Sequence, residues 1–241
     1  MVTGTSGPSR CWLAERPQLH DKVEFDVVPT CYALDFDHWW RRLERDGGFD
    51  TQDLSSLAEG LREITRGAFR RTPTDLAVID TLQERFSVIR QRSLTDLDRA
   101  VALLEDCRRV GTLAFAHLAR SGFVAVTLLR SAVTMGILSQ AAVDDFLNTI
   151  RTVSHQFTDD AARVAQGQLP FDWRAEREDF FRALAEAGLP SDTREVEAFL
   201  RGAIEGREKA KFEFTRYLSL ALDCIAGFAD GHGLSREDVA Q

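Results

Sequence analysis

A cluster of basic side chains lies near the C-terminal end of the sequence, in the segment REKAKFEFTR. Because a helix has about 3.6 residues per turn, Arg207, Lys211 and Thr215 fall on one stripe of it. Cations in such a stripe could offset the charge of a phosphoryl group during its transfer to an acceptor. The pattern also fits a solvated helix face, with Phe212 and Phe214 packing against the core.

Two histidines are further candidates. His155 follows Arg151 by one helical turn, and its imidazole titrates near neutrality, as a general base or an acceptor-orienting group requires. His117 lies with Arg120 in the most apolar segment, where a polar side chain must find a partner or line a cavity. The plainer alternative for both is a partly buried histidine satisfied by its neighbours. The candidate substrate-binding residues are therefore Arg207, Lys211, Thr215, Arg151, His155, His117 and Arg120.

Acidic residues are concentrated before the first expected helix. Asp21, Glu24, Asp26, Asp35 and Asp37 supply carboxylates of the kind that bind Mg²⁺. An exposed strand edge explains these charges equally well, and the four cysteines show no zinc-ligand spacing. We therefore predict no metal site in this chain.

The neighbouring residues His38, Trp39 and Trp40 form an aromatic group. Paired tryptophans can mark a face that docks against another domain, because large aromatic side chains are enriched in interfaces. Ordinary packing within the same domain is the alternative, and the sequence leaves both open.

The composition argues against some classes of protein. The 241 residues include 44% hydrophobic residues and 16 phenylalanines, enough for a sizeable core. A net charge of -8 and a pI near 5.2 argue against nucleic acid as a partner. No uninterrupted apolar run is long enough to span a membrane, and the first residues lack the apolar region of a secretory signal. We expect a cytoplasmic protein that binds neither nucleic acid nor membrane.

The sequence predicts a mainly α fold, an irregular multi-helix domain with a short β appendage at its N-terminal end. Residues 1–20 are rich in Gly, Ser, Thr and Pro and are expected to form a loop or linker. Residues 21–36 are expected to form the β appendage, since apolar and acidic residues alternate up to Pro29 and a second extended piece can follow. Residues 37–241 show helical periodicity and form the helical domain.

Caps and breakers predict the helix boundaries. Pro73 is expected to break one helix, and Gly111 to separate two others. Ser139 and either Ser191 or Asp192 are expected to start later helices. The expected helices cover residues 37–45, 51–72, 74–107 with a bend at Ser93-Leu94, 112–135, 140–166, 171–187 and 203–228.

Two segments resemble a known family. HDKVEFDVVPTCYALDFD and RGAIEGREKAKFEFTRYLSLALDCIAGFADGHGLSRED are similar to the region between the ATP-grasp and phosphohistidine domains of phosphoenolpyruvate-synthase-like phosphotransferases, and the resemblance covers roughly residues 12–238. It is nearer to the glutamine kinase of capsule biosynthesis than to rifampin phosphotransferase, whose corresponding all-helical domain binds the antibiotic.

The resemblance implies that the chain is one part of a larger enzyme. ATP would phosphorylate a histidine on a mobile domain, which would deliver the phosphoryl group to an acceptor bound here, such as the amide of glutamine. ATP and Mg²⁺ are implied for the complete enzyme, with no cofactor on this chain alone. The implied partners are the ATP-grasp and phosphohistidine domains, in cis or in trans, and a small-molecule phosphate acceptor.

The chain itself lacks the motifs of phosphate chemistry. It has no GxxxxGK[ST] or GxGxxG loop, and its one Ser-His pair, Ser154-His155, lacks the preceding glycines of a phosphohistidine segment. We therefore expect an acceptor-binding or linker domain that is not catalytic alone, and we assign no catalytic residue. The alternative is a free-standing helical module for protein interaction or regulation. A metal-dependent hydrolase ranks lower, since only His155 with Asp159 and Asp160 has the required spacing.

Overall fold

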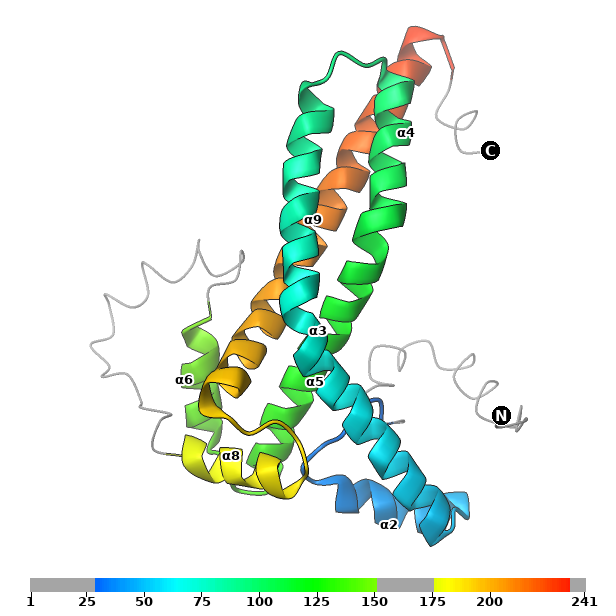
Figure 1. The fold of residues 1–241 in the computed structure, drawn as a ribbon. Coiled ribbons are helices and arrows are strands. Elements are labelled where there is room, and N and C mark those ends of the chain that lie inside the picture. The colour runs from blue at the N-terminus through cyan, green and yellow to red at the C-terminus, as the bar shows by residue number, and fades with distance from the viewer. Residues whose placement is uncertain (1–28, 151–175, 235–241) are drawn as a thin grey trace.

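The computed structural model describes residues 29–150 and 176–234. In that part of the chain the fold is mainly α, as predicted, and most residues belong to a long helical stalk (Figure 1). A continuous rod runs antiparallel to α3 and α9 and contacts both of them. The stalk consists of α3 (Thr51–Gln91), α9 (Thr193–Gly231) and this rod, made of α4 (Asp96–Asp106), η3 (Cys107–Gly111) and α5 (Thr112–Thr134).

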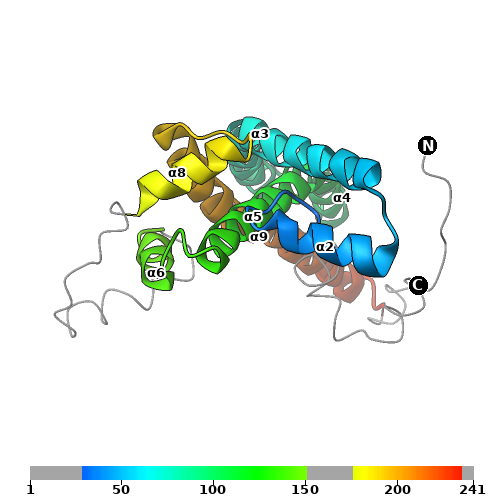
Figure 2. The same cartoon turned by 90° about the horizontal axis from the view of Figure 1, so that it is seen from below.

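Shorter helices gather at one end of the stalk, which we call the base (Figure 2). They are α2 (Phe36–Gly47), α6 (Gln140–Asn148) and α8 (Arg177–Glu186). The largest apolar core includes buried side chains from these helices and from the stalk, among them Phe146, Phe180 and Leu200. Burial of apolar surface is the dominant favourable term in folding, so this shared core stabilises the packing of the short helices against the ends of the stalk helices.

Side-chain caps fix several helix starts. Thr95 accepts the backbone N–H of Asp98 at the start of α4. Ser139 caps α6, as predicted, and accepts the N–H of Ala142 at 3.1 Å. Of the two predicted starts for the last segment, Asp192 is the cap of α9. That helix therefore begins well before the expected residue 203.

The predicted break at Pro73 is wrong, because α3 continues through this residue. A proline inside a helix costs about 3 kcal/mol or more, so packing on both sides of it must outweigh that cost. Before the proline, the Phe69 ring stacks on Phe199 of α9, and after it Ile79 is buried. Figure 1 shows that α3 changes direction along its length, as an internal proline causes.

The rod also departs from the predicted boundaries. The helix expected to follow the proline ends at Gln91, and a new helix starts at Asp96. Gly111, expected as a separator, lies in the π-helical turn η3 that joins α4 to α5. A Cβ atom there would lie 3.3 Å from Leu82 Cδ2 and 3.4 Å from Phe214 Cδ2. Close packing therefore uses this glycine inside the rod, although glycine by itself disfavours a helix interior.

The second extended piece of the predicted β appendage is wrong, because residues 29–36 contain no strand. Their backbone N–H groups bond to side chains of the stalk instead. The N–H of Tyr32 donates to Thr65 Oγ1 at 2.9 Å, and the N–H of Leu34 donates to Ser131 Oγ at 3.0 Å. These bonds satisfy donors that a partner strand would otherwise satisfy.

Some expectations lie outside the described residues. They are the linker at residues 1–20, the first part of the β appendage at residues 21–28, and the parts of two expected helices that fall in residues 151–175.

The rod Asp96–Thr134 is, among the described helices, the one long and apolar enough to cross a membrane by length and composition, with a mean hydropathy of 1.4 in its most apolar window. Buried helices at the centre of water-soluble proteins pass the same test, and 44% of that window is buried. The rod also holds buried polar side chains that bond to α3, such as Ser121 with Thr72. The absence of a membrane partner therefore stays a prediction.

Gly206 tests how closely α9 packs. A Cβ atom there would lie 2.6 Å from Leu76 Cδ2 and 3.1 Å from Leu118 Cδ2. We expect Gly206→Leu to lower the free energy of unfolding by roughly 1–3 kcal/mol through overpacking. Gly60→Leu is the control, because nothing lies within 4 Å of its Cβ position, and it should leave stability unchanged or raise it. Urea denaturation followed by circular dichroism compares the two variants, and equal stabilities would contradict the packing argument.

Candidate functional site

The predicted basic stripe lies along one flank of α9. The guanidinium of Arg207 is partly buried and lies 5.2 Å from the centre of the Phe123 ring of α5. Lys211 and Thr215 are exposed. Phe214 stacks on a phenylalanine of α5 at 5.2 Å between ring centres and contacts Gly111, so this flank lies beside η3 and the start of α5.

The other described candidates contact different neighbours. His117 Nδ1 lies 3.2 Å from Asp75 Oδ1 of α3, and Arg120 Nη1 donates to the Thr30 carbonyl oxygen at 3.4 Å. The described candidates therefore bond to separate parts of the fold, and their contacts do not converge on one ligand position. Two candidates lie outside the described residues, Arg151 and His155.

A buried polar layer, which sequence analysis missed, crosses the stalk where α4 meets η3. Asp106 is 7% exposed and forms two hydrogen bonds with Arg85 of α3, with Arg85 Nε donating to Asp106 Oδ2 at 2.8 Å. This bonding is the main cause of a raised pKa for Arg85. Tyr217 of α9 donates its hydroxyl to the Leu82 carbonyl oxygen at 2.8 Å, and burial raises the pKa of this phenol. The layer ties α3 to both other parts of the stalk.

The thiols at this level are not activated. Burial raises the pKa of Cys107 to about 11, and Asp106 adds to the effect. Burial likewise raises the pKa of Cys224. Because the thiolate is the nucleophile, these two cysteines are suited to packing rather than to covalent chemistry.

A second buried carboxylate lies on α9. Glu213 is 3% exposed and pairs with Arg216, whose guanidinium lies 4.0 Å from the centre of the Phe86 ring. Burial raises the pKa of Glu213, and it outweighs the lowering effect of Arg216 and Lys209. Both cations are turned towards α3, since Lys209 pairs with Asp80 on that helix.

The sequence contained a signal for these buried groups. Ala210, Glu213 and Tyr217 have the spacing of one face of a helix, and the structure buries all three. Asp106 follows Leu103 by three residues on the buried face of α4. A carboxylate at a core position requires a hydrogen-bonding or charged partner. Reading the acidic residues against the apolar periodicity would have identified Glu213 and Asp106.

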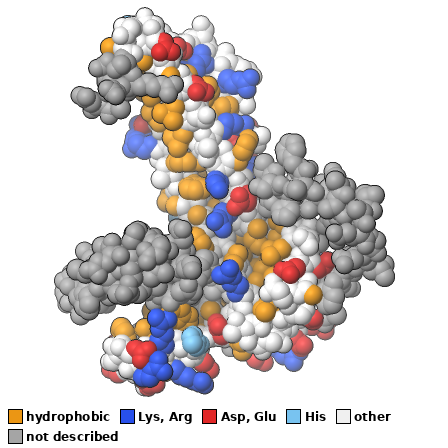
Figure 3. Space-filling model, turned by 180° about the vertical axis from the view of Figure 1, so that it is seen from behind, with side chains coloured by type: hydrophobic (Ala, Val, Ile, Leu, Met, Phe, Trp, Pro, Cys, Tyr) orange, Lys and Arg blue, Asp and Glu red, His pale blue; other side chains and the backbone are white. Residues whose placement is uncertain are grey.

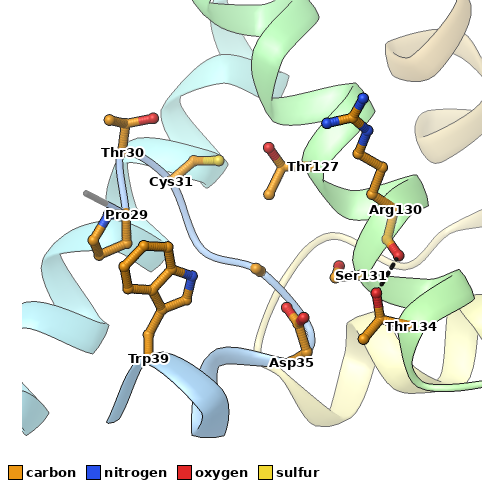
Figure 4. Close-up of a pocket in the computed structure, with 10 residues that line it drawn as sticks. Pro29, Thr30, Cys31, Asp35, Trp39, Thr127, Arg130, Ser131 and Thr134 are labelled. Atoms are coloured by element: carbon orange, nitrogen blue, oxygen red, sulfur yellow. Dashed lines mark hydrogen bonds between the residues drawn. The ribbon is translucent and has the colours of Figure 1, made fainter. Parts of the chain in front are cut away.

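A small cavity of about 150 Å³ lies between α5 and the segment that leads into α2 (Figure 4). Asp35 and Trp39 lie on one side of it, and Thr127 and Ser131 of α5 lie on the other. The Ser131 hydroxyl accepts the N–H of Leu34 and donates to its own helix, so it holds this segment onto α5. The cavity is separate from the predicted basic stripe.

Two further features suggested by the sequence are candidate metal ligands and the aromatic group at His38–Trp40. Within residues 29–150 and 176–234, no group of three or more His, Cys, Asp and Glu could hold a metal ion. Trp39 and Trp40 are partly buried against the core of the base, and Arg42 lies 5.2 Å from the Trp39 ring centre. These contacts favour the packing alternative for the two tryptophans.

An exposed apolar face runs along the outer side of the stalk where α4 meets α9 (Figure 3). Leu97, Val101 and Leu104 lie on successive turns of α4 and are 46%, 60% and 42% exposed. Leu222 of α9 is 65% exposed, and Ile225 is partly exposed on the same flank; both border a cavity of about 330 Å³ that α9 residues and Leu234 line, with no residue from α4. We call this face the α4–α9 groove, and it is lined by Leu97, Val101, Leu104, Leu218, Leu222 and Ile225.

Contacts with α3 place the groove on the far side of the stalk. On α4, Arg99 donates to carbonyl oxygens at the end of α3, and Asp106 bonds to α3 as well. On α9, Lys209 pairs with α3. Successive helix residues are about 100° apart, so Val101 and Leu222 lie on the flanks of α4 and α9 that point away from these contacts. In the described part of the chain, α3 therefore does not cover the groove.

Comparisons with protein-family models, with curated proteins and with solved structures give no match for this chain. The resemblance to phosphoenolpyruvate-synthase-like phosphotransferases thus stays a prediction from the sequence.

Glu213 gives the stability of the stalk a pH dependence. Its pKa in the folded protein lies above the ordinary value of 4.5. A raised carboxyl pKa contributes stability at pH values below 4.5, and this contribution is lost as the pH rises through the folded-state pKa. We expect Glu213→Gln to raise the free energy of unfolding relative to the wild type more at pH 7 than at pH 4.

Urea denaturation at the two pH values measures this effect, with the exposed Glu84→Gln on α3 as the control. A Glu213→Gln variant that is more destabilised at pH 7 than at pH 4 would show that the ion pair with Arg216 outweighs burial.

Proposed function

We propose that the chain is a helical binding module whose stalk receives an amphipathic helix of a partner protein in the α4–α9 groove. The observation that carries the proposal is the row of half-exposed apolar side chains on two adjacent helices, Leu97, Val101, Leu104 and Leu222. Contiguous apolar surface of this kind marks interaction sites in soluble proteins. An amphipathic helix lays its own apolar stripe into a groove between two helices.

The polar groups of the stalk support a binding role for the described part of the chain. Asp106, Arg85 and Tyr217 bond to one another or to the backbone, and His117 pairs with Asp75. Groups engaged in this way serve packing and register. They are not arranged as a nucleophile with an adjacent base, which covalent catalysis requires.

The energy available in the groove is moderate. Full burial of a Val or Leu side chain contributes about 1.5–3 kcal/mol. Covering the remaining exposed halves of the four side chains would therefore contribute roughly 3–6 kcal/mol. An affinity of about 1 μM requires roughly 8 kcal/mol, so a partner must add further contacts.

Charge substitutions inside the groove test the proposal. The probe is a fluorescent synthetic helix with leucines at positions i, i+3, i+4 and i+7, and its affinity is measured by fluorescence anisotropy. We expect Val101→Glu and Leu222→Glu to weaken binding at least tenfold, because each places a charge on the apolar face. Val88→Glu is the matched control, since Val88 is 53% exposed on α3 and lies outside the groove.

All three variants should keep the melting temperature of the wild type within a few degrees, because the substituted side chains are exposed. Equal losses of affinity in Val88→Glu and Val101→Glu, or no binding of the probe to the wild type, would contradict the proposal.

A second candidate function is the acceptor-binding domain of a phosphotransferase of the phosphoenolpyruvate-synthase type. The observation in its favour is Lys211, which is exposed and has no ion pair among the described residues. In a complete enzyme with ATP-grasp and phosphohistidine domains, Lys211→Ala should abolish phosphoryl delivery and leave histidine phosphorylation intact. Lys209→Ala is the control, because Lys209 is already paired with Asp80. Unchanged turnover in Lys211→Ala would remove the basic stripe from this role.

A further inference from the structure

The α4–α9 groove changes character along its length. Arg108 follows Val101 by seven residues, so it continues the same stripe of the rod at the level where η3 begins. On α9, Lys211, Leu218 and Ile225 are likewise seven residues apart and share one flank. The groove is therefore apolar towards the free end of the stalk and basic beside η3. Figure 3 shows hydrophobic side chains along the whole stalk, with Lys and Arg side chains among them further down this face and charged side chains of both signs at its upper end.

Contacts of α9 place the two basic positions on either side of one packing contact near η3. Phe214 packs against Gly111 at the end of η3 and stacks on Phe115 at the start of α5. Because the rod and α9 are antiparallel, Lys211 lies about one helical turn from this contact towards the base, and Arg108, within η3, lies about one turn from it towards the free end. Both side chains are exposed, with 68% of the Arg108 side chain accessible.

The charges at this end do not cancel. Arg108 and Arg109 both pair with Glu105, and hydrogen bonding to Arg108 is the main cause that lowers the pKa of Glu105 to about 2. That carboxyl is therefore ionised throughout the physiological range, yet it offsets only one of the two cations. Lys211 has no ion pair among the described residues. The chain as a whole carries a net charge of -8, so the local excess of positive charge here has the opposite sign to the charge of the whole chain.

We propose that the partner helix carries carboxylate side chains at the end of its apolar stripe that lies beside η3, where they pair with Arg108 and Lys211. This inference rests on the proposed function, because it assumes that a helix occupies the groove. Opposite charges at one end of a binding face determine orientation and raise the association rate, and like charges there disfavour other partners. These ion pairs would add to the binding free energy, which the apolar side chains alone do not raise to the value that an affinity of about 1 μM requires.

Three synthetic probe helices test the charge requirement. They share one apolar stripe and end in three glutamates, three glutamines or three lysines. We expect the glutamate probe to bind about tenfold more tightly than the glutamine probe and the lysine probe to bind more weakly than both. The double variant Arg108→Gln with Lys211→Gln should remove these differences. Raising the NaCl concentration from 0.1 M to about 1 M should do the same, since salt screens exposed charges.

A zero-length carbodiimide cross-link tests the placement. It joins a carboxylate to an amine in contact with it, and mass spectrometry identifies the amine. We expect the acidic end of the glutamate probe to couple to Lys211 and not to Lys209, which is held by Asp80. Lys211→Arg is the matched control, because it keeps the charge and should keep the affinity while losing the cross-link.

The outcomes separate this inference from the proposed function. If all three probes bind equally and Val101→Glu weakens each of them, the groove binds helices and the charge inference is wrong. If no probe shows a dependence on Val101, both proposals fail. Light scattering that shows a dimer which Val101→Glu dissociates would make a second copy the occupant and overturn the inference. Binding to anionic lipid vesicles that depends on Val101 would overturn it as well.

Discussion

The stalk depends on the close approach of α9 to the other two parts of the bundle. Gly206 faces Leu76 of α3 and Leu118 of α5 at once, and Ala203 and Ala210 on the same face are fully buried. These small residues let the backbones approach closely between Ala203 and Ala210, so a larger side chain at Gly206 would meet Leu76 and Leu118. Further along α9 the same face carries the buried Tyr217, whereas Leu218 and Leu222 lie on its flank.

Buried hydrogen bonds fix the positions of α4 and α9 along α3. The Tyr217 hydroxyl reaches a backbone carbonyl of α3, and Asp106 bonds to Arg85 on the same helix. A slip of one residue along either helix would leave these groups buried and unpaired, at a cost of about 1–3 kcal/mol for each group. The π-helical turn η3 lies at the same level, and its extra residue lets Gly111 meet Phe214 while Asp106 keeps its bond. Register and close packing thus depend on each other.

Much of the fold was predictable because local signals and packing agreed. Ser139 and Asp192 start helices as their cap chemistry indicates, and apolar periodicity identified the helical domain. The predicted helix breaks at Pro73 and Gly111 were wrong because helix propensity describes a residue without its tertiary neighbours. Stacking of Phe69 on Phe199 holds α3 together before Pro73, and the narrow gap to Leu82 and Phe214 favours glycine at position 111. For the candidate site, the sequence found the stripe of Arg207 and Lys211 but not the groove. The groove depends on which flank of α4 meets α9, and that follows from tertiary contacts rather than from spacing.

The groove itself follows from the way the stalk is assembled. A helix in a bundle buries the stripe that faces its neighbours, and α4 has neighbours on two sides only among the described residues, α3 and α9. Its apolar stripe is wider than this contact, because it extends from the buried Ala100 and Leu103 to the exposed Leu97 and Val101. Apolar residues on a solvated flank weaken solubility, and about half of each of these side chains adds nothing to the packing seen here, whereas Arg108 continues the same flank with a charge. This width, which exceeds the contact with α3 and α9 among the described residues, is the physical basis of the proposal that a partner helix packs there.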